Sequence, residues 1–128
     1  MAVPYLQVDN LTKSFGDLVL FENISFGIAE GQRVGLIAKN GSGKTTLMNM
    51  LSGIYYPDEG QIYIHGKPVT IASPKDAFDN GIGMIHQHFK LVDVFTATEN
   101  IVLGLEGKLN LADASKKVRE ICEKYGFD

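Results

Sequence analysis

The feature that most constrains this chain is a glycine-rich run at residues 41–46 (GSGKTT), which lies between an apolar segment and an amphipathic one. Glycines allow successive backbone N–H groups to turn inward and form a concavity that binds anions. A helix that begins at the same point adds about half a unit of positive charge. We therefore expect a strand, a phosphate-binding loop over residues 38–46 and a helix over about residues 44–52.

The side chains of this run suit a nucleotide with its magnesium ion. Lys44 can reach the β- and γ-phosphate oxygens as a point charge, and Thr45 offers a hydroxyl to Mg²⁺, a hard cation that prefers oxygen ligands. Thr46 is expected at the α-phosphate. The other candidate phosphate-binding positions are Ala38, Asn40, Gly41, Ser42 and Gly43. The alternative is a glycine-rich turn that only caps a helix, and the lysine and paired threonines favour the nucleotide site.

One position departs from the general pattern of such loops. Glycine is expected six residues before the lysine, and this chain has Ala38 there. Alanine would cost on the order of 1 kcal/mol or more if the backbone needed a positive φ at this point. A negative φ at the end of the preceding strand would remove that cost, so we expect nucleotide binding to survive.

Hydrophobic periodicity predicts a mixed α/β chain. Alternating apolar and polar residues predict antiparallel strands, and short continuous apolar runs predict buried parallel strands. The expected antiparallel strands cover residues 5–11, 18–21 and 23–28, a hairpin covers 61–64 and 68–71 with its turn at His65-Gly66, and the parallel runs cover 33–37 and 82–85.

Three further helices are predicted by their start and stop signals. Ser73 as N-cap with Pro74 behind it begins a short helix that Gly81 closes. Thr96 and Glu99 have capping-box spacing. The last helix is expected over residues 111–125, because its apolar residues recur on one face.

Composition excludes several classes of protein. The 128-residue chain has a net charge of −3, so nucleic acid is not an expected partner. Its single cysteine, Cys122, excludes an intramolecular disulfide. No apolar run approaches the roughly 18–20 residues needed to span a bilayer, and the first ten residues lack the pattern of a signal peptide. We expect the chain to be soluble and cytoplasmic.

The chain resembles the ATP-binding cassette (ABC) family over nearly all of its length. Residues 11–16 (LTKSFG) are similar to the family's adenine-stacking segment, with Phe15 as the ring, and residues 31–37 (GQRVGLI) to its lead-in strand. Residues 83–89 (GMIHQHF), followed by 95–100 (FTATEN), resemble the family's glutamine loop. The resemblance implies that Gln87 touches Mg²⁺ or orients the attacking water.

The resemblance implies an α/β fold of the P-loop NTPase type in its ABC form. The expected parts are an antiparallel β subdomain, the start of the parallel core sheet and the beginning of the helical subdomain. The ATP-binding core and β subdomain would occupy residues 1–90, and the glutamine-loop exit and helical start residues 91–128. The fold would be truncated, because the family's Walker B, signature and switch-histidine segments are not found. We therefore expect nucleotide binding without efficient turnover, together with a tendency to aggregate.

The implied function is ATP binding and hydrolysis coupled to import of a small solute such as a sugar or nucleoside. ATP and Mg²⁺ are the implied cofactors, Lys44 and Gln87 the implied catalytic residues, and Thr45 with Gln87 the implied metal contacts. The implied partners are a transmembrane permease subunit and a second nucleotide-binding domain. The chain would then lie at the inner face of the cell membrane, peripheral to it through the permease.

Two branches of the family remain open at this stage. Residues 61–104 look like the ATP-binding subunit of simple-sugar or nucleoside importers, and we favour this branch because that stretch is the more specific one. Residues 5–50 also resemble soluble, translation-associated cassette ATPases, in which nucleotide gates docking and nothing is transported. A fragment or a chimera joined between about residues 51 and 60 is the third possibility.

Overall fold

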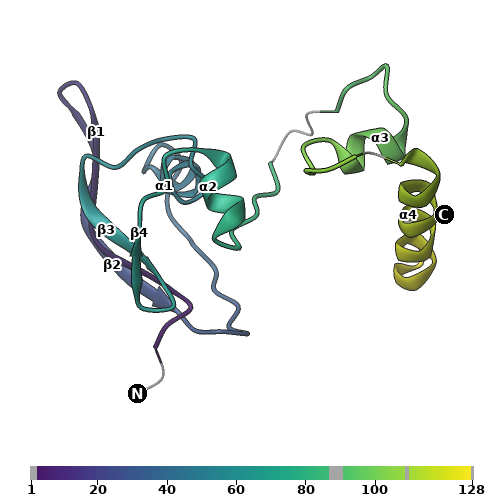
Figure 1. Ribbon diagram of the computed structural model, residues 1–128. Helices are drawn as coiled ribbons and strands as arrows, with labels where there is room; N and C mark the ends of the chain where they lie inside the picture. The colour runs from purple at the N-terminus through teal and green to yellow at the C-terminus, as the bar shows by residue number, and fades with distance from the viewer. Residues whose placement is uncertain (1–2, 87–90, 109, 128) are drawn as a thin grey trace. The chain divides into compact units, whose positions relative to one another are not determined.

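The computed structural model describes residues 3–86, 91–108 and 110–127, which form two compact units, one within Met1–Ile85 and one within His86–Asp128 (Figure 1). The first unit contains, in chain order, β1 (Leu6–Phe15), β2 (Leu18–Ile28), α1 (Lys44–Leu51), β3 (Glu59–Ile64), β4 (Lys67–Val69) and α2 (Pro74–Asp79). The second unit contains α3 (Ala97–Val102) and α4 (Leu111–Tyr125). The predicted antiparallel strands and all four predicted helices are therefore confirmed.

The four strands form one antiparallel sheet in the order β2-β1-β3-β4. β2 is continuous, although its sequence predicts two strands that meet at residue 22. Asn23 takes a left-handed φ of 52°, and its N–H donates to the Thr12 hydroxyl at 3.1 Å. This irregularity allows the chain to remain paired with β1 across the polar residues, because a bulge absorbs a change of register without ending the ladder.

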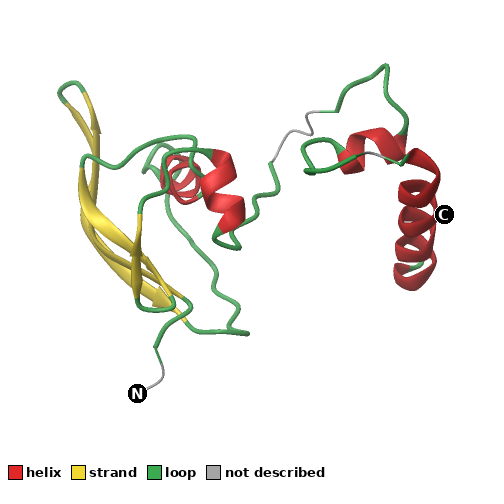
Figure 2. Cartoon of the chain, in the orientation of Figure 1, coloured by secondary structure: helices red, strands yellow, loops and turns green. Residues whose placement is uncertain are grey.

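The core lies between the sheet and the pair of helices α1 and α2, which sit beside it in Figure 1 and Figure 2. Val8 and Met50 are completely buried, and Leu11 is also fully enclosed. The other buried apolar residues are Leu6, Phe21, Leu47, Leu51, Ile62, Ile64, Ile71 and Ala77. Because α1 contributes three residues to this core, the helix that follows the glycine-rich loop packs against the sheet.

Two predicted strands do not form, and this corrects the expectation of a parallel core sheet in the described residues. Segments 33–37 and 82–85 lie in no strand. The apolar side chains of 33–37 are exposed, with Ile37 at 96%; in 82–85, Ile85 is 91% exposed, whereas Ile82 packs against the core. A strand needs a neighbouring ladder for its N–H and C=O groups. Within the described residues the sheet contains only β1–β4, so neither segment has such a neighbour.

The helix boundaries follow the predicted capping signals. The Ser73 side chain accepts from the Asp76 N–H at 3.2 Å, and Pro74 occupies the first helical turn of α2. Thr96 and Glu99 form the predicted capping box at α3, where the Thr96 N–H donates to Glu99 Oε2 at 2.7 Å. That hydrogen bond, with one from the Thr96 hydroxyl, holds the pKa of the Glu99 carboxyl below its usual value.

In the second unit, α3 packs beside the longer α4. Asn110 caps α4 by accepting from the N–H groups of Ala112 and Asp113, and Gly126 ends it with a left-handed φ of 71°. None of the helices in the described part of the chain is both long and apolar enough to cross a bilayer.

Candidate functional site

The glycine-rich loop connects the exposed segment after β2 to the first turn of α1, and Figure 2 shows this connection running unpaired beside the sheet. Gly43 is the N-cap of α1 and takes a left-handed φ of 88°. A Cβ at this position would lie 2.9 Å from Cδ1 of Phe21 in β2. Glycine is therefore needed at Gly43 for its backbone conformation and for its close approach to the sheet.

Among the described residues, no side chain caps the N-terminus of α1, and no acidic residue lies in its first turn. The first N–H groups of any helix lack intrahelical acceptors, and the helix dipole makes this end positive. The beginning of α1 is therefore suited to an external anion that accepts several N–H bonds.

Hydrogen bonds close the loop on itself. The Lys44 ammonium donates to the carbonyl oxygen of Ala38, which joins the two ends of the predicted phosphate site. Within the loop, the Ser42 hydroxyl donates to the Lys39 carbonyl at 2.5 Å, and the Ser42 N–H donates to the same oxygen at 3.3 Å. Lys44 is thus held across the loop, where its ammonium can exchange a carbonyl acceptor for an anion.

Ala38 does not occupy the left-handed region. Among the described residues, the non-glycine positions with positive φ are Asn10, Asn23 and His65, so Ala38 avoids the cost considered above. The loop's left-handed positions are Gly41, with φ of 83°, and Gly43. Glycine is therefore present where this loop requires a left-handed backbone.

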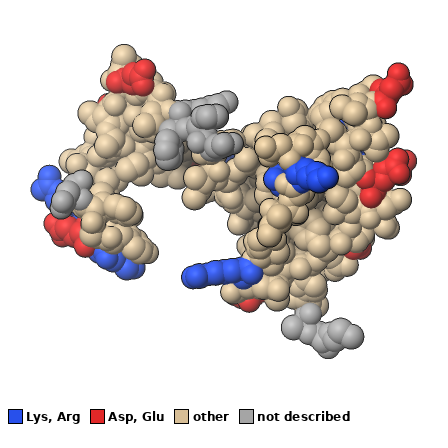
Figure 3. Space-filling model, turned by 180° about the vertical axis from the view of Figure 1, so that it is seen from behind, with Lys and Arg blue, Asp and Glu red and all other residues tan. Residues whose placement is uncertain are grey.

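The exposure of the loop's side chains differs in a way that suits their predicted roles. Thr45 is exposed, whereas Lys44 and Thr46 are half-buried; Asn40, Gly41 and Ser42 are exposed. Figure 3 shows the described Lys and Arg side chains of the visible face as separate groups among Asp and Glu. Within the loop, attraction of phosphate would come from Lys44 and the local N–H groups.

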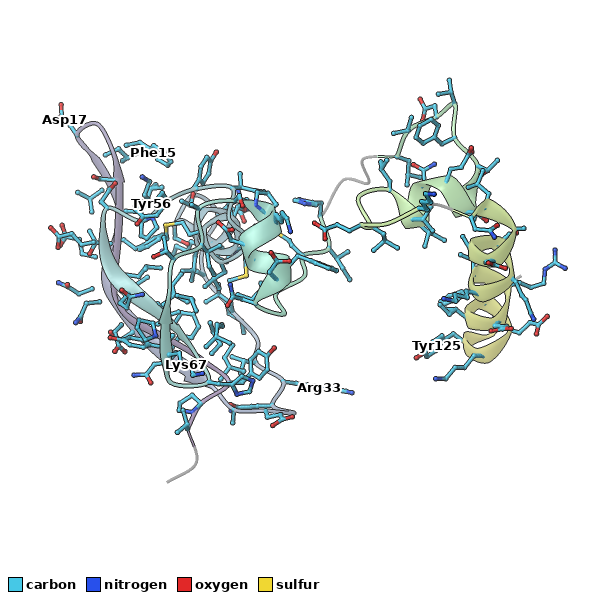
Figure 4. The ribbon with its side chains drawn as sticks, in the orientation of Figure 1. Phe15, Asp17, Arg33, Tyr56, Lys67 and Tyr125 are labelled. Atoms are coloured by element: carbon cyan, nitrogen blue, oxygen red, sulfur yellow. The ribbon has the colours of Figure 1, made fainter. Side chains whose placement is uncertain are left out.

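Phe15 lies at the end of β1 and is 46% exposed (Figure 4). Its ring centroid lies 5.5 Å from that of Tyr55, with an interplanar angle of 74°. The ammonium of Lys13 lies 5.1 Å from the centre of the Phe15 ring. Phe15 therefore presents a partly accessible ring with one aromatic and one cationic neighbour.

The segment after α1 is tied back to the end of β1 through Asp58. Its carboxylate accepts from the Ser14 N–H at 2.8 Å and from the Lys13 ammonium at 3.0 Å. These contacts, with the Ser14 hydrogen bond as the larger effect, hold the pKa of the Asp58 carboxyl below its usual value. The Asp58 N–H also donates to the Thr12 carbonyl at 3.0 Å.

Sequence reasoning missed Tyr55 and Lys13 as neighbours of Phe15, and Asp58 as the partner of Lys13 and Ser14. Residues 56–60 (YPDEG) have the composition of a turn. Nothing in the local pattern indicates that this turn contacts a strand more than 40 residues earlier. The predicted site residue Gln87 lies outside the described residues, and His86 beside it is exposed.

In the second unit, a groove of about 480 Å³ is lined mainly by apolar side chains. Its lining residues are Leu91, Val92, Asp93, Phe95, Ala97, Asn100 and Ile101. Asn100 fixes the wall of the groove, because its side chain accepts from the Val92 N–H at 2.8 Å and donates to the Val92 carbonyl at 3.2 Å. The two hydrogen bonds tie α3 to the segment that precedes it.

The sequence of this chain is similar to those of known proteins. The sequence model of the family described as ABC transporter matches residues 21–128. The chain is 46% identical over 126 residues to the nucleoside import ATP-binding protein NupA of Lactococcus lactis subsp. cremoris, covering 95% of this chain and 25% of NupA. It is 43% identical over 126 residues to the guanosine import ATP-binding protein NupO of Bacillus subtilis, with coverage of 95% and 25%.

Solved structures give the same likeness. A nucleotide-free ATP-binding cassette from an ABC transporter matches with a TM-score of 0.73 and 29% identity, over 89% of this chain and 46% of that one. The ADP conformation of the cassette MJ1267 matches with a TM-score of 0.58 and 32% identity, over 61% and 31%. The chain spans about a quarter of the length of the curated relatives described above.

Proposed function

The chain belongs to the ABC transporter family, and from this premise we propose that it binds the phosphates of Mg-ATP at residues 38–46. One observation supports this most directly. The first turn of α1 presents N–H groups that no side chain of the described residues caps, and the Lys44 ammonium lies across the same loop. These donors match a polyphosphate, because several N–H groups and one cation can share its oxygens.

The residues of the loop also fit a magnesium ion that arrives with the nucleotide. Thr45 is exposed and immediately follows Lys44, so its hydroxyl is available as an oxygen ligand. A bound Mg²⁺ would neutralise part of the phosphate charge. In the proposed reaction, ATP hydrolysis by the whole protein, Lys44 stabilises charge on the phosphates and Gln87 orients water.

We propose that the whole protein couples this hydrolysis to import of a nucleoside or simple sugar. The support is the identity of 46% and 43% with relatives whose names describe nucleoside and guanosine import, and of 44% with a ribose import ATP-binding protein of Corynebacterium glutamicum. Its partners would be a permease, a second nucleotide-binding domain and ATP, at the inner face of the membrane.

The groove lined by residues 91–101 is our candidate for the permease contact. Val94 is 88% exposed and Leu91 66% exposed, and such apolar side chains are available for burial against a protein partner. Genomic context distinguishes the branches of the family. Permease genes beside this gene would support the importer, whereas two cassettes in one reading frame without a permease would support the soluble branch.

The experiment that tests the phosphate site is a titration of the chain with Mg-ATP followed by amide resonances. We expect the resonances of Gly41, Gly43 and Lys44 to shift in a saturable manner. Resonances of α4 provide an internal control, because that helix belongs to the other compact unit. Loop resonances that stay unmoved at millimolar Mg-ATP would contradict the proposed function.

Replacement of Ala38 by glycine is expected to change the affinity for Mg-ATP by less than about threefold. Ala38 already has a backbone conformation open to alanine, so glycine relieves no strain there and adds only chain entropy. Calorimetric titration of the parent chain and Ala38→Gly provides the measurement. Undetectable binding in the parent that Ala38→Gly restores would show that alanine damages the loop.

A further inference from the structure

Tyr55 connects two elements that would hold different parts of a nucleotide. Its ring contacts Phe15 at the end of β1, with the rings nearly perpendicular. Its backbone follows directly from α1, because the N–H groups of Ile54 and Tyr55 both donate to the Asn49 carbonyl, at 2.8 and 3.2 Å. The aromatic contact therefore joins the helix of the phosphate loop to the strand that carries the exposed ring.

The connection is held by polar contacts as well. Asp58 bonds to the Ser14 N–H and pairs with Lys13, whose side chain is only 13% exposed. The same Lys13 ammonium lies near the centre of the Phe15 ring. Phe15 thus contacts Tyr55, from the segment that follows α1, and Lys13 of β1, which Asp58 of that same segment holds in place.

This restraint has a consequence for a ligand that carries both a base and phosphates. The phosphates would be held at the start of α1, whereas the base would stack on a ring from β1. A ring that kept its rotamer freedom would have to lose it on binding, and the affinity would fall accordingly. A ring that is already fixed loses little conformational entropy on binding.

We propose that Tyr55 is a positioning residue that fixes Phe15 as a platform for the base of the bound nucleotide. This inference rests on the proposed function, because it assumes that the phosphates bind at residues 38–46. It adds a residue that acts through Phe15 and does not touch the phosphates. Tyr55 should therefore affect only those ligands that carry a base.

The test compares Mg-ATP with magnesium tripolyphosphate, which has the phosphates but no base. We expect Tyr55→Ala to weaken Mg-ATP binding about three- to tenfold, the range that an aromatic pair accounts for, with tripolyphosphate affinity kept within about twofold. Tyr55→Phe keeps the ring and should bind Mg-ATP like the parent chain. Tyr56→Ala is the matched control, because Tyr56 is the next residue, is 59% exposed, and makes no ring contact within the described part of the chain.

A double-mutant cycle separates positioning from direct contact. If Tyr55 acts through Phe15, adding Tyr55→Ala to Phe15→Ala should cause no further loss of Mg-ATP affinity. An additional loss in that background, an equal loss for tripolyphosphate, or no effect of Tyr55→Ala on Mg-ATP would each overturn the inference. A parent chain that binds tripolyphosphate as tightly as Mg-ATP would overturn it while leaving the phosphate site intact. A parent chain that binds neither ligand would overturn the proposed function together with it.

Discussion

Replacing Lys44 with alanine is expected to weaken Mg-ATP binding by about a hundredfold, the factor that corresponds to loss of one strong charge-assisted hydrogen bond. In the structure this ammonium lies across the loop and donates to the Ala38 carbonyl. A bound polyphosphate would offer a charged acceptor in place of a neutral one, so the ammonium would contribute more to the complex than to the free chain. Truncation of Lys44 to alanine therefore removes more stabilisation from the nucleotide complex than from the free chain, so the affinity for Mg-ATP falls.

The measurement is calorimetric titration with Mg-ATP, and Lys67→Ala provides the matched control. Lys67 lies in β4, is exposed, and its removal changes the net charge by the same amount (Figure 4). We expect Lys67→Ala to bind like the parent chain, since an exposed charge away from the loop is screened by salt. Amide spectra of both variants establish that they are folded. A Lys44→Ala variant within threefold of the parent would show that the loop does not hold the phosphates.

Local signals predicted the helices of this chain well. α4 begins and ends at the residues that its periodicity indicates, because Asn110 and Gly126 cap it from within the same stretch of sequence. α2 likewise follows from Ser73 and Pro74. A cap depends on residues only three or four positions apart, so the sequence contains all that is needed to place it.

Strands were harder to predict, because a strand is completed only by its neighbours in space. The apolar run at 33–37 has the composition of a buried strand, yet Ile37 is 96% exposed and unpaired. Conversely, β2 continues through the polar residues at 22–23, where hydrophobic periodicity predicts a break, since Asn23 bonds across to Thr12. In both cases pairing with another segment decides whether a strand forms, and hydrophobic periodicity does not indicate that pairing.

The candidate site likewise contains one part that the sequence predicts and one part that it does not. Residues 38–46 are contiguous, so their glycines, lysine and threonines could be assigned to one loop from the sequence. The surroundings of Phe15 come from two separate stretches of the chain, the end of β1 and the segment after α1, and could not be assigned. Tyr55 and Asp58 contact Phe15 and Ser14 in a unit in which α1 packs on the sheet. Long-range contacts of this kind depend on the complete fold of the unit.

Gly53 shows how that packing is achieved at the far end of α1. Its φ is 78°, and a Cβ there would lie 2.1 Å from the Ser73 carbonyl oxygen and 2.8 Å from the Pro74 nitrogen. The end of α1 thus touches the backbone at the start of α2. α2 in turn contributes Ala77, and α1 contributes Met50, to the same buried cluster. No larger residue fits between the two helices without moving one of them.

Gly53→Ala is therefore expected to lower the free energy of unfolding by roughly 2–5 kcal/mol, which combines left-handed strain with overpacking against backbone. Gly31→Ala isolates the strain, because Gly31 has a similar φ of 73° and open space around its Cα. That control should lose only about 1 kcal/mol. Urea titration of both variants gives the comparison.

Equal losses of stability in the two variants would mean that residues 73–74 move without cost to make room for the added methyl group. The position of α1 would then not depend on α2. A larger loss in Gly53→Ala, with weaker Mg-ATP binding in the fraction that stays folded, would connect this buried glycine to the loop at the opposite end of α1.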